Sequence, residues 1–364
     1  MVFYITFRNL NSTGHAGIRK KVIAQTKALE KEMGRAYYTF WCNQMAYLMH
    51  EEEVIEQELA ITRREYGNVL IHWIEKHRVK RTYVRYPLSD QSFIDFLRYQ
   101  KEKEIRTVLE IPTYPYDDEL PEGRGKKEDI YYRRMVGEYI DIISTYSYDT
   151  EIWGKKCIKL INGIDLDKIS LSNRKKEHDQ IVMIAVGCME PWHGFERLIE
   201  GMGNYYLTGG DRKVYLQLVG EGVELNRYRR EIEHFKIQEY VEICGQKEGD
   251  ALTECFNHSD IAIGSLGFYK NGITEGSPIK GAEYCARGLP MVIGYTDMRF
   301  PKDIPFILQV SNDNSAVNIE QIVNFYDCVT ARKNYQMEIQ NYAAQYLSWN
   351  RIMKPVAEYL KKEA

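Results

Sequence analysis

The sequence predicts an α/β protein built from two doubly wound, mainly parallel sheets. Its length of 364 residues exceeds what one hydrophobic core usually organises. Short apolar runs alternate with amphipathic helical patterns throughout, which is typical of parallel strands joined by helices. A polar, charge-rich stretch at residues 165–180 lacks an apolar period and separates two such series. We therefore expect two domains of comparable size.

In the first half, each predicted strand is a short apolar run followed by a loop or a helix. A helix is predicted from about Gly17 to Met33, after the first run and a polar loop. These elements predict an N-terminal domain over residues 1–165. The predicted strands are VFYITF, YYTFW, TYVRY, TVLEI and YIDIIST.

The second half repeats this rhythm and predicts a domain over residues 166–335. Residues 336–364 form a helical segment whose docking site the pattern leaves open. Ligands of doubly wound sheets bind beyond the carboxyl ends of the strands, so we expect the two domains to face a central cleft. The predicted strands are IVMIAVG, VYLQLVG, YVEICG, DIAIG and PMVIG, with ERLIEGM as a helix.

Composition excludes several classes of protein. The 49 basic and 52 acidic residues give a formal net charge of -3, which argues against a nucleic-acid-binding protein. No run approaches the ~20 apolar residues that span a bilayer, and MVFYITFRN is too short for a signal peptide. Seven cysteines without a CxxC pair favour reduced, buried thiols. A cytoplasmic protein is expected.

The most informative segment is residues 260–294, DIAIGSLGFYKNGITEGSPIKGAEYCARGLPMVIG. Serine at the cap and proline at the first position make Ser277-Pro278 a predicted helix start. The N–H groups at such a start form an anion site suited to a diphosphate. Lys270 and Lys280 flank this end and can neutralise the charge.

Two glutamates accompany this helix. Glu275 lies just before it, and Glu283 lies one and a half turns inside it. One carboxylate can address a sugar while the other reaches a ribose. In a chain with 28% charged residues, the same spacing also arises on an ordinary solvated helix face. The glycine, proline and lysine context favours the ligand site.

The first domain offers a loop-to-helix segment, NSTGHAGIRKK, that contains Gly14 and Gly17. It places three cations, Arg19, Lys20 and Lys21, in the first turn of the predicted helix, where they oppose the helix dipole. A nearby anionic ligand would offset this arrangement. An exposed helix start stabilised by water is the alternative.

A second loop, LEIPTYPYDDE, follows a predicted strand at residues 109–119. Glu110, Tyr114 and Asp117 can accept or position hydroxyl groups there. Arg85, at the end of TYVRY, is a comparable candidate, with a structural ion pair as the alternative. The basic cluster EKHRVKR at 75–81 is either a membrane-contact patch or a solvated helix end.

Several motifs together resemble one known family. The pattern Glu275-x7-Glu283, running into EYCARGLP, is similar to the donor-site signature of retaining glycosyltransferase family 4, which has the GT-B fold. The resemblance covers nearly the whole chain, most strongly residues 158–294. WHGFER resembles a variant in a subgroup associated with surface-polysaccharide assembly. The other motifs, in family order, are NGID at 162–165, VGCMEPWHGFERLIEG at 186–201, LVGEG at 218–222 and Gly245 after VEIC.

The resemblance implies a retaining transfer of a hexose from a nucleotide-diphosphate sugar to a saccharide acceptor, possibly lipid-linked through a polyprenyl diphosphate. The first domain would bind the acceptor and the second the donor, with Glu283 on the ribose and Glu275 on the sugar. No metal or other cofactor is implied. The implied catalytic residues are Glu275, Lys280 and Glu110, and the implied donor-binding residues are Gly14, Gly17, Gly187, His193, Gly245, Lys270, Ser277, Pro278, Ile279 and Glu283.

One departure from the family leaves the function open. Many members carry an Arg and a Lys on the donor phosphates, where this chain has Cys188 and His193. Lys270 and Lys280 are expected to supply the charge instead, and His193 is either a phosphate ligand or a structural histidine. A non-catalytic partner subunit that stabilises an active transferase is therefore one alternative. A nucleotide-sugar epimerase or a glycan phosphorylase on the same fold is another.

Overall fold

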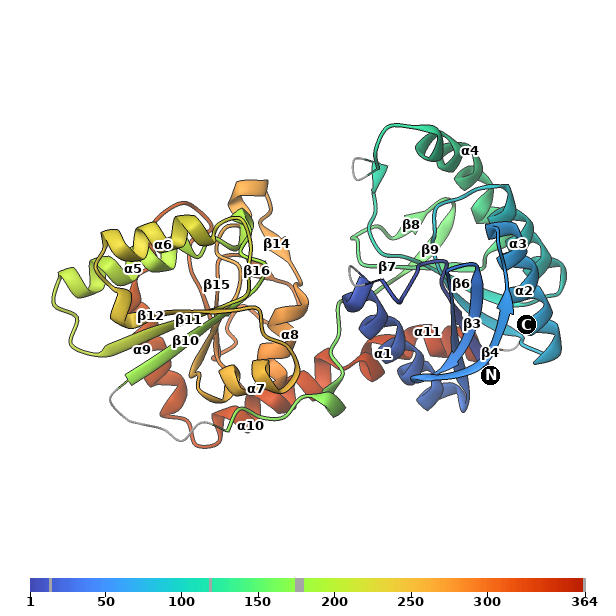
Figure 1. Ribbon diagram of the computed structural model, residues 1–364. Coiled ribbons are helices and arrows are strands. Elements are labelled where there is room, and N and C mark those ends of the chain that lie inside the picture. The colour runs from blue at the N-terminus through green and yellow to red at the C-terminus, as the bar shows by residue number, and fades with distance from the viewer. Residues whose placement is uncertain (13–14, 118–119, 174–179, 363–364) are drawn as a thin grey trace. The chain divides into compact units, whose positions relative to one another are not determined.

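The computed structural model describes residues 1–12, 15–117, 120–173 and 180–362. Within them the chain forms two compact units, drawn in Figure 1. Unit 1 contains Met1–Ile161 and Trp349–Ala364, and unit 2 contains Asn162–Ser348. Residues 162–165, expected in the first domain, pack with unit 2. The C-terminal helical segment is divided between both units.

Unit 1 contains a sheet with the strand order β4-β3-β2-β1-β5-β6-β7-β9-β8. Strands β2, β1, β5, β6, β7 and β9 are parallel to one another. Strands β3 and β4 at one edge of the sheet and β8 at the other run antiparallel to their neighbours. The antiparallel β3–β4 hairpin at one edge was not among the predicted elements. The bounds are β1 Val2–Ile5, β2 Ala36–Cys42, β3 Met45–His50, β4 Glu53–Leu59, β5 Arg81–Arg85, β6 Arg106–Ile111, β7 Ile142–Thr145, β8 Glu151–Ile152 and β9 Lys155–Lys159.

Helices cover both faces of this sheet because each presents an apolar stripe to the buried strands. One core joins β1 and β2 to α1 and α11, and the other joins β1 and β6 to α2 and α3. Figure 1 shows α11 lying beside α1, although the two helices come from opposite ends of the chain. The bounds are α1 Ala16–Met33, α2 Arg63–Lys76, α3 Gln91–Glu102, α4 Arg124–Tyr139 and α11 Trp349–Lys361.

Unit 2 contains a parallel sheet in the order β12-β11-β10-β13-β15-β17. The order reverses between β10 and β13, so the loops after these two strands diverge to opposite faces. A small pair, β14 and β16, lies outside this sheet. The bounds are β10 Gln180–Val186, β11 Lys213–Val219, β12 Val241–Gly245, β13 Ile261–Ile263, β14 Glu275–Gly276, β15 Met291–Ile293, β16 Thr296–Asp297 and β17 Ile307–Gln309.

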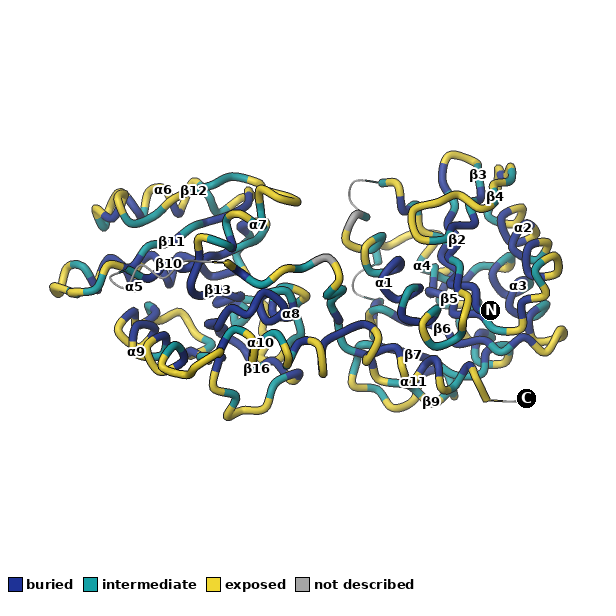
Figure 2. The backbone as a smooth tube through the Cα atoms, turned by 90° about the horizontal axis from the view of Figure 1, so that it is seen from below, coloured by how far each residue is buried: buried dark blue, intermediate teal, exposed yellow. Residues whose placement is uncertain are grey.

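The central strands of both units, such as β1 and β10, are buried, whereas the outer faces of helices such as α6 are exposed (Figure 2). In unit 2, α5, α6 and α9 share one core with the sheet, and α7, α8 and α10 lie on its other face. The bounds are α5 Glu196–Leu207, α6 Leu225–His234, α7 Gly249–Asn257, α8 Ile279–Ala286, α9 Ile319–Thr330 and α10 Tyr335–Tyr342.

The predicted α/β class with two doubly wound parallel sheets is confirmed. The expectation of buried cysteines was largely wrong. Only Cys42 and Cys285 are buried among the seven, while Cys188 and Cys328 are exposed. None of the described helices combines the length and apolar character that crossing a bilayer requires.

Candidate functional site

Three glycines bring the carboxyl ends of β10, β11 and β12 close together. The Gly187 N–H donates to Val219 O at 3.0 Å, and the Gly220 N–H donates to Gly245 O at 2.8 Å. A Cβ on Gly220 would lie 1.8 Å from Gly187 O, so any larger residue would collide with the backbone there. The predicted donor residues Gly187 and Gly245 therefore stand in one row along the carboxyl edge of the sheet.

His193, in the turn after β10, and Lys280, in the first turn of α8, meet beside this row. Lys280 Nζ lies 3.1 Å from His193 Nε2. A Cβ on Gly187 would lie 2.6 Å from Nζ and 2.8 Å from Nε2, so both groups border the same small space. The Glu190 N–H donates to His193 Nδ1 at 3.2 Å, which assigns the ring proton to Nε2. Two donors therefore face this space.

The electrostatics of this pair leave Lys280 as its cation. Burial and the neighbouring Lys280 lower the pKa of His193 to about 4, so the ring is neutral near pH 7. Burial also lowers the pKa of Lys280. Among the described residues, no carboxylate lies within salt-bridge distance of its ammonium group. The site has the charge and the donors to hold an anion.

The start of α8 differs from its prediction. Pro278, not Ser277, is the N-cap residue, and no side chain caps the helix. The reason is that Pro278 is extended, with φ -58° and ψ 141°, so the helix begins at Ile279. Arg299 holds this turn instead, donating to Pro278 O at 2.7 Å. Ile279 and Lys280 still occupy the first turn of α8, where N–H groups lack helical partners.

Lys270 does not join Lys280 as predicted. Its ammonium group forms an ion pair with the buried Glu196 and donates to Pro191 O at 2.9 Å. Glu196 therefore neutralises Lys270, which fastens the loop after β13 to the turn that carries His193. The sequence did not reveal this pairing, because the two residues are 74 positions apart.

The two glutamates of the family signature lie on different elements. Glu275 is exposed on β14, where it pairs with Thr296 of β16. Glu283 lies inside α8 and forms an ion pair with Arg287 at 3.1 Å. Their predicted roles on the sugar and the ribose stay predictions.

Glu110 is fully buried within unit 1, surrounded by hydrogen-bond donors. Its carboxylate accepts from Tyr4 at 2.7 Å, Arg85 at 2.8 Å and Tyr146 at 3.0 Å, and Lys21 Nζ lies at 3.4 Å. Burial alone would raise its pKa, but Arg85 and Lys21 outweigh this effect and hold the pKa at about 2. This geometry argues against the predicted catalytic role, because the carboxylate faces the unit's interior and all its neighbours donate to it.

Arg85 accordingly forms the structural ion pair that was its alternative interpretation. Lys21 is buried by the same cluster, and burial lowers its pKa to about 8. Of the other first-domain candidates, Gly17 is exposed near the start of α1, and Gly14 lies outside the described residues. In the basic cluster, Lys76 and His77 both bind Glu56, which neutralises part of it.

Two arginines at this site were missed by sequence reasoning. Arg197 of α5 is 2% exposed and donates to the carbonyls of Leu266, Ser311 and Ser315. Arg299 is paired with Asp297 at 2.5 Å and donates to Asn162 O at 3.2 Å. An arginine inside the apolar run of a predicted helix, as in FERLIEG, was the available signal for Arg197.

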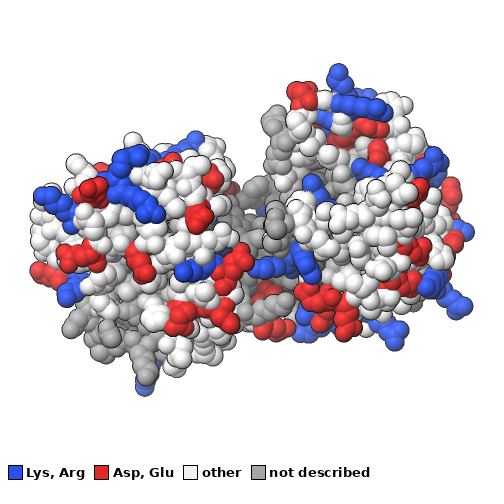
Figure 3. Space-filling model, viewed as in Figure 1, with Lys and Arg blue, Asp and Glu red and all other residues white. Residues whose placement is uncertain are grey.

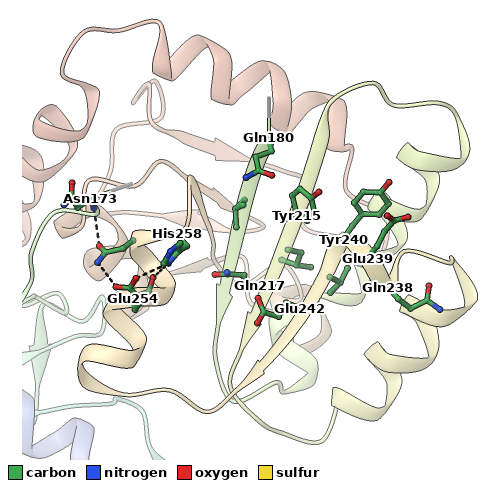
Figure 4. A pocket seen from close by; sticks show the side chains of 14 residues that line it. Asn173, Gln180, Tyr215, Gln217, Gln238, Glu239, Tyr240, Glu242, Glu254 and His258 are labelled. Carbon is green, nitrogen blue, oxygen red and sulfur yellow. Dashed lines mark hydrogen bonds and ion pairs between the residues drawn. The ribbon is translucent and has the colours of Figure 1, made fainter. Parts of the chain in front are cut away.

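A further groove of unit 2 lies elsewhere, near the amino ends of the same strands. It encloses about 900 Å³ and is lined by Gln180, Tyr215 and Tyr240 among others (Figure 4). It lacks the glycine row and the His193–Lys280 pair. On the face in Figure 3, acidic and basic side chains are interspersed over both units, as the balanced composition predicts.

Comparison with known proteins supports the fold. Residues 168–304 match the family model of glycosyl transferases group 1. This range contains the glycine row, His193 and Lys280. No curated protein matches the chain at a significant level.

Solved structures match over the whole chain. A glycosyltransferase from Rickettsia africae aligns with a TM-score of 0.66 at 13% identity, covering 100% of this chain and 99% of its own. Sucrose-phosphate synthase from Thermosynechococcus elongatus gives 0.63 at 12% identity, covering 98% and 97%. HepE from Anabaena, solved with UDP and glucose, gives 0.59 at 10% identity, covering 100% and 99%. The fold is therefore GT-B.

Proposed function

We propose that this protein is a retaining glycosyltransferase that moves a hexose from a nucleotide-diphosphate sugar to a saccharide acceptor. The observation that carries the proposal is the His193–Lys280 pair beside Gly187, at the switch point of a unit whose sequence matches glycosyl transferases group 1. HepE, one of the similar structures, was solved with UDP and glucose, which supports a nucleotide-sugar donor.

The chemistry assigned to the site is stabilisation of a leaving diphosphate. Breaking the bond between sugar and phosphate leaves negative charge on the diphosphate oxygens, and fixed donors in a desolvated site stabilise such charge best. Lys280 supplies a cation, His193 a neutral N–H donor, and the first turn of α8 its backbone N–H groups. Lys280 and His193 thus replace the Arg and Lys of other family members, and we expect transfer to need no bound metal.

Glu275 completes the proposed donor site. Its exposed carboxylate lies four residues before the first turn of α8, where it can accept hydrogen bonds from sugar hydroxyls. Glu283, inside α8, would bind the ribose in exchange for part of its contact with Arg287. A surface-polysaccharide acceptor, in some cases held at the inner membrane face by its lipid, belongs to the proposal through the resemblance alone.

Turnover of a panel of UDP-, GDP- and ADP-sugars with saccharide acceptors tests this function. The expected result is transfer from one donor, a product whose anomeric configuration by proton NMR equals that of the donor, and loss of transfer in Glu275→Ala. An inverted product would contradict the retaining mechanism. Nucleotide binding without transfer to any acceptor would instead favour the partner-subunit alternative.

A further inference from the structure

The loop between β17 and α9, residues 311–315, binds the segment that leads to Glu275 through the side chain of Asn312. We propose that Asn312 of this loop is a positioning residue, which sets how Glu275 is presented to the donor sugar. This inference rests on the proposed function and deepens it, because it separates recognition of the sugar from recognition of the diphosphate.

The side-chain amide of Asn312 binds the loop before Glu275 at two points. Its Oδ1 accepts from the Tyr269 N–H at 3.0 Å, and its Nδ2 donates to Ile273 O at 2.9 Å. One amide group therefore holds both ends of the segment from Tyr269 to Ile273. Ile273 lies two residues before Glu275, so this bond acts close to the carboxylate.

The opposite side of Glu275 is also fixed. Glu275 pairs with Thr296 in the β14–β16 ladder, and the Thr296 N–H donates to Thr274 O at 2.9 Å. The backbone of this short strand is thus held between β16 and the Asn312 amide. The two hydrogen bonds of Asn312 thus support the segment before Glu275 on one side, and the ladder with β16 supports it on the other.

The loop that carries Asn312 is itself rigidly held. Asp313 Oδ1 accepts from the Ser315 N–H at 2.9 Å and from Ser311 Oγ at 3.1 Å. The buried Arg197 donates to the carbonyls of Ser311 and Ser315 at 3.0 and 2.7 Å. Since Arg197 also donates to Leu266 O at 2.5 Å, it joins this loop to the loop after β13.

None of these contacts involves the proposed diphosphate ligands. The loop after β13 reaches the backbone beside His193 through the Leu266 N–H, which donates to His193 O at 2.7 Å, and through Lys270, which donates to Pro191 O. Asn312 bonds neither of these residues, since its partners are Tyr269 and Ile273. Removing the Asn312 amide should therefore weaken recognition of the sugar and leave recognition of the nucleotide diphosphate unchanged. A residue that merely stabilised the fold would affect both equally.

The test compares Asn312→Ala with wild type in two assays. These are the KM for the nucleotide sugar in transfer, and the calorimetric Kd for the matching nucleotide diphosphate. We expect the KM to rise about tenfold, as for loss of one to two hydrogen bonds, with the Kd unchanged. Asn312→Asp keeps the acceptor for Tyr269 and loses the donor to Ile273, so it should give a smaller rise.

Asn314→Ala is the matched control, because Asn314 is exposed on the same loop and no side-chain hydrogen bond is found for it within the described chain. Equal KM values in Asn312→Ala and Asn314→Ala would overturn the inference. So would an equal loss of both affinities, or loss of folding in both Asn312 variants. If wild type binds neither nucleotide nor nucleotide sugar, the proposed function itself fails and this inference falls with it.

Discussion

Both units gather charged side chains near the carboxyl ends of their central strands, but they treat the charge differently. In unit 1, Glu110 is surrounded by Arg85, Lys21 and two tyrosine hydroxyls, and every partner lies within hydrogen-bond or ion-pair distance. In unit 2, Lys280 Nζ lies 3.1 Å from a neutral histidine and has no carboxylate partner among the described residues. The first cluster satisfies its own charge, whereas we propose that an anion completes the second.

This difference shows that the residue type is a weaker guide to function than the balance of charge around it. Glu110 fits the catalytic-carboxylate pattern by sequence, yet its charge is used within the fold. A buried pair of this kind is costly to break, because the remaining partner is left charged and desolvated. Lys280, by contrast, is half-buried without a carboxylate partner among the described residues, and a bound anion would stabilise its charge.

The largest effect should follow from removing the charge of Glu110, which pairs with Arg85 and Lys21 in unit 1. Glu110→Gln leaves Arg85 and Lys21 buried without a counter-charge, and we expect the free energy of unfolding to fall by about 3–5 kcal/mol. Urea unfolding monitored by circular dichroism measures this loss. Glu102→Gln, at an exposed position of unit 1, is the control and should change stability little. A small loss in Glu110→Gln would show that the cluster is not balanced as described.

Crowding the His193–Lys280 pair should have the next largest effect. Gly187→Ala would place a methyl group 2.6 Å from Lys280 Nζ and 2.8 Å from His193 Nε2 in the present geometry. Because the nitrogens must move away, nucleotide diphosphate affinity should fall about tenfold or more. Calorimetry measures the affinity. Gly67→Ala, where a new Cβ meets nothing within 4 Å, should bind normally.

The pH dependence of binding sharpens the comparison further. Because burial lowers the pKa of Lys280, its ammonium charge is lost as pH rises, below the range in which an ordinary lysine titrates. Nucleotide affinity should therefore fall across this alkaline range. His193, with a pKa of about 4, stays neutral and adds no change there. Lys280→Arg keeps its charge, so its binding should stay constant; an equal fall in both proteins would implicate another group.

The acid stability of the protein tests the same Glu110 cluster by titration. The folded-state pKa of Glu110, about 2, lies below the value of about 4.3 for an unfolded glutamate. Its contribution is therefore complete above the unfolded pKa and is lost as pH falls towards 2. The stability difference between wild type and Glu110→Gln should shrink over this interval in urea titrations. A difference that stays constant with pH would contradict the depressed pKa.

Apolar runs were sufficient to predict most of the fold. Each predicted strand of unit 2 matches an observed one, because parallel strands buried on both faces need continuous apolar sequence. The β3–β4 hairpin was missed, since β4 and the turn before it contain five glutamates and lack such a run. The helix start at Ser277 was misjudged because the extended Pro278 shifts it by one position.

The site was predictable in its location but not in its charge pairing. The glycines, His193 and Lys280 follow predicted strands, so the carboxyl-edge rule brings them together. The partners of Lys270 and Glu110 depend on contacts between distant segments, which periodicity does not reveal. For Glu110, however, a signal was present: an acidic residue within the apolar run TVLEI predicts a buried partner, and Arg85 ends the neighbouring run.

Calorimetry with UDP, GDP and ADP tests most directly whether a nucleotide binds at the His193–Lys280 pair of unit 2 and not at the Glu110 cluster of unit 1. Wild type, Lys280→Ala and Glu110→Gln would be compared at a temperature where all three are folded. We expect one nucleotide to bind wild type and Glu110→Gln alike, and Lys280→Ala about 10- to 100-fold more weakly, as for loss of a charged hydrogen bond. Normal binding by Lys280→Ala, with loss of binding in a folded Glu110→Gln, would contradict it.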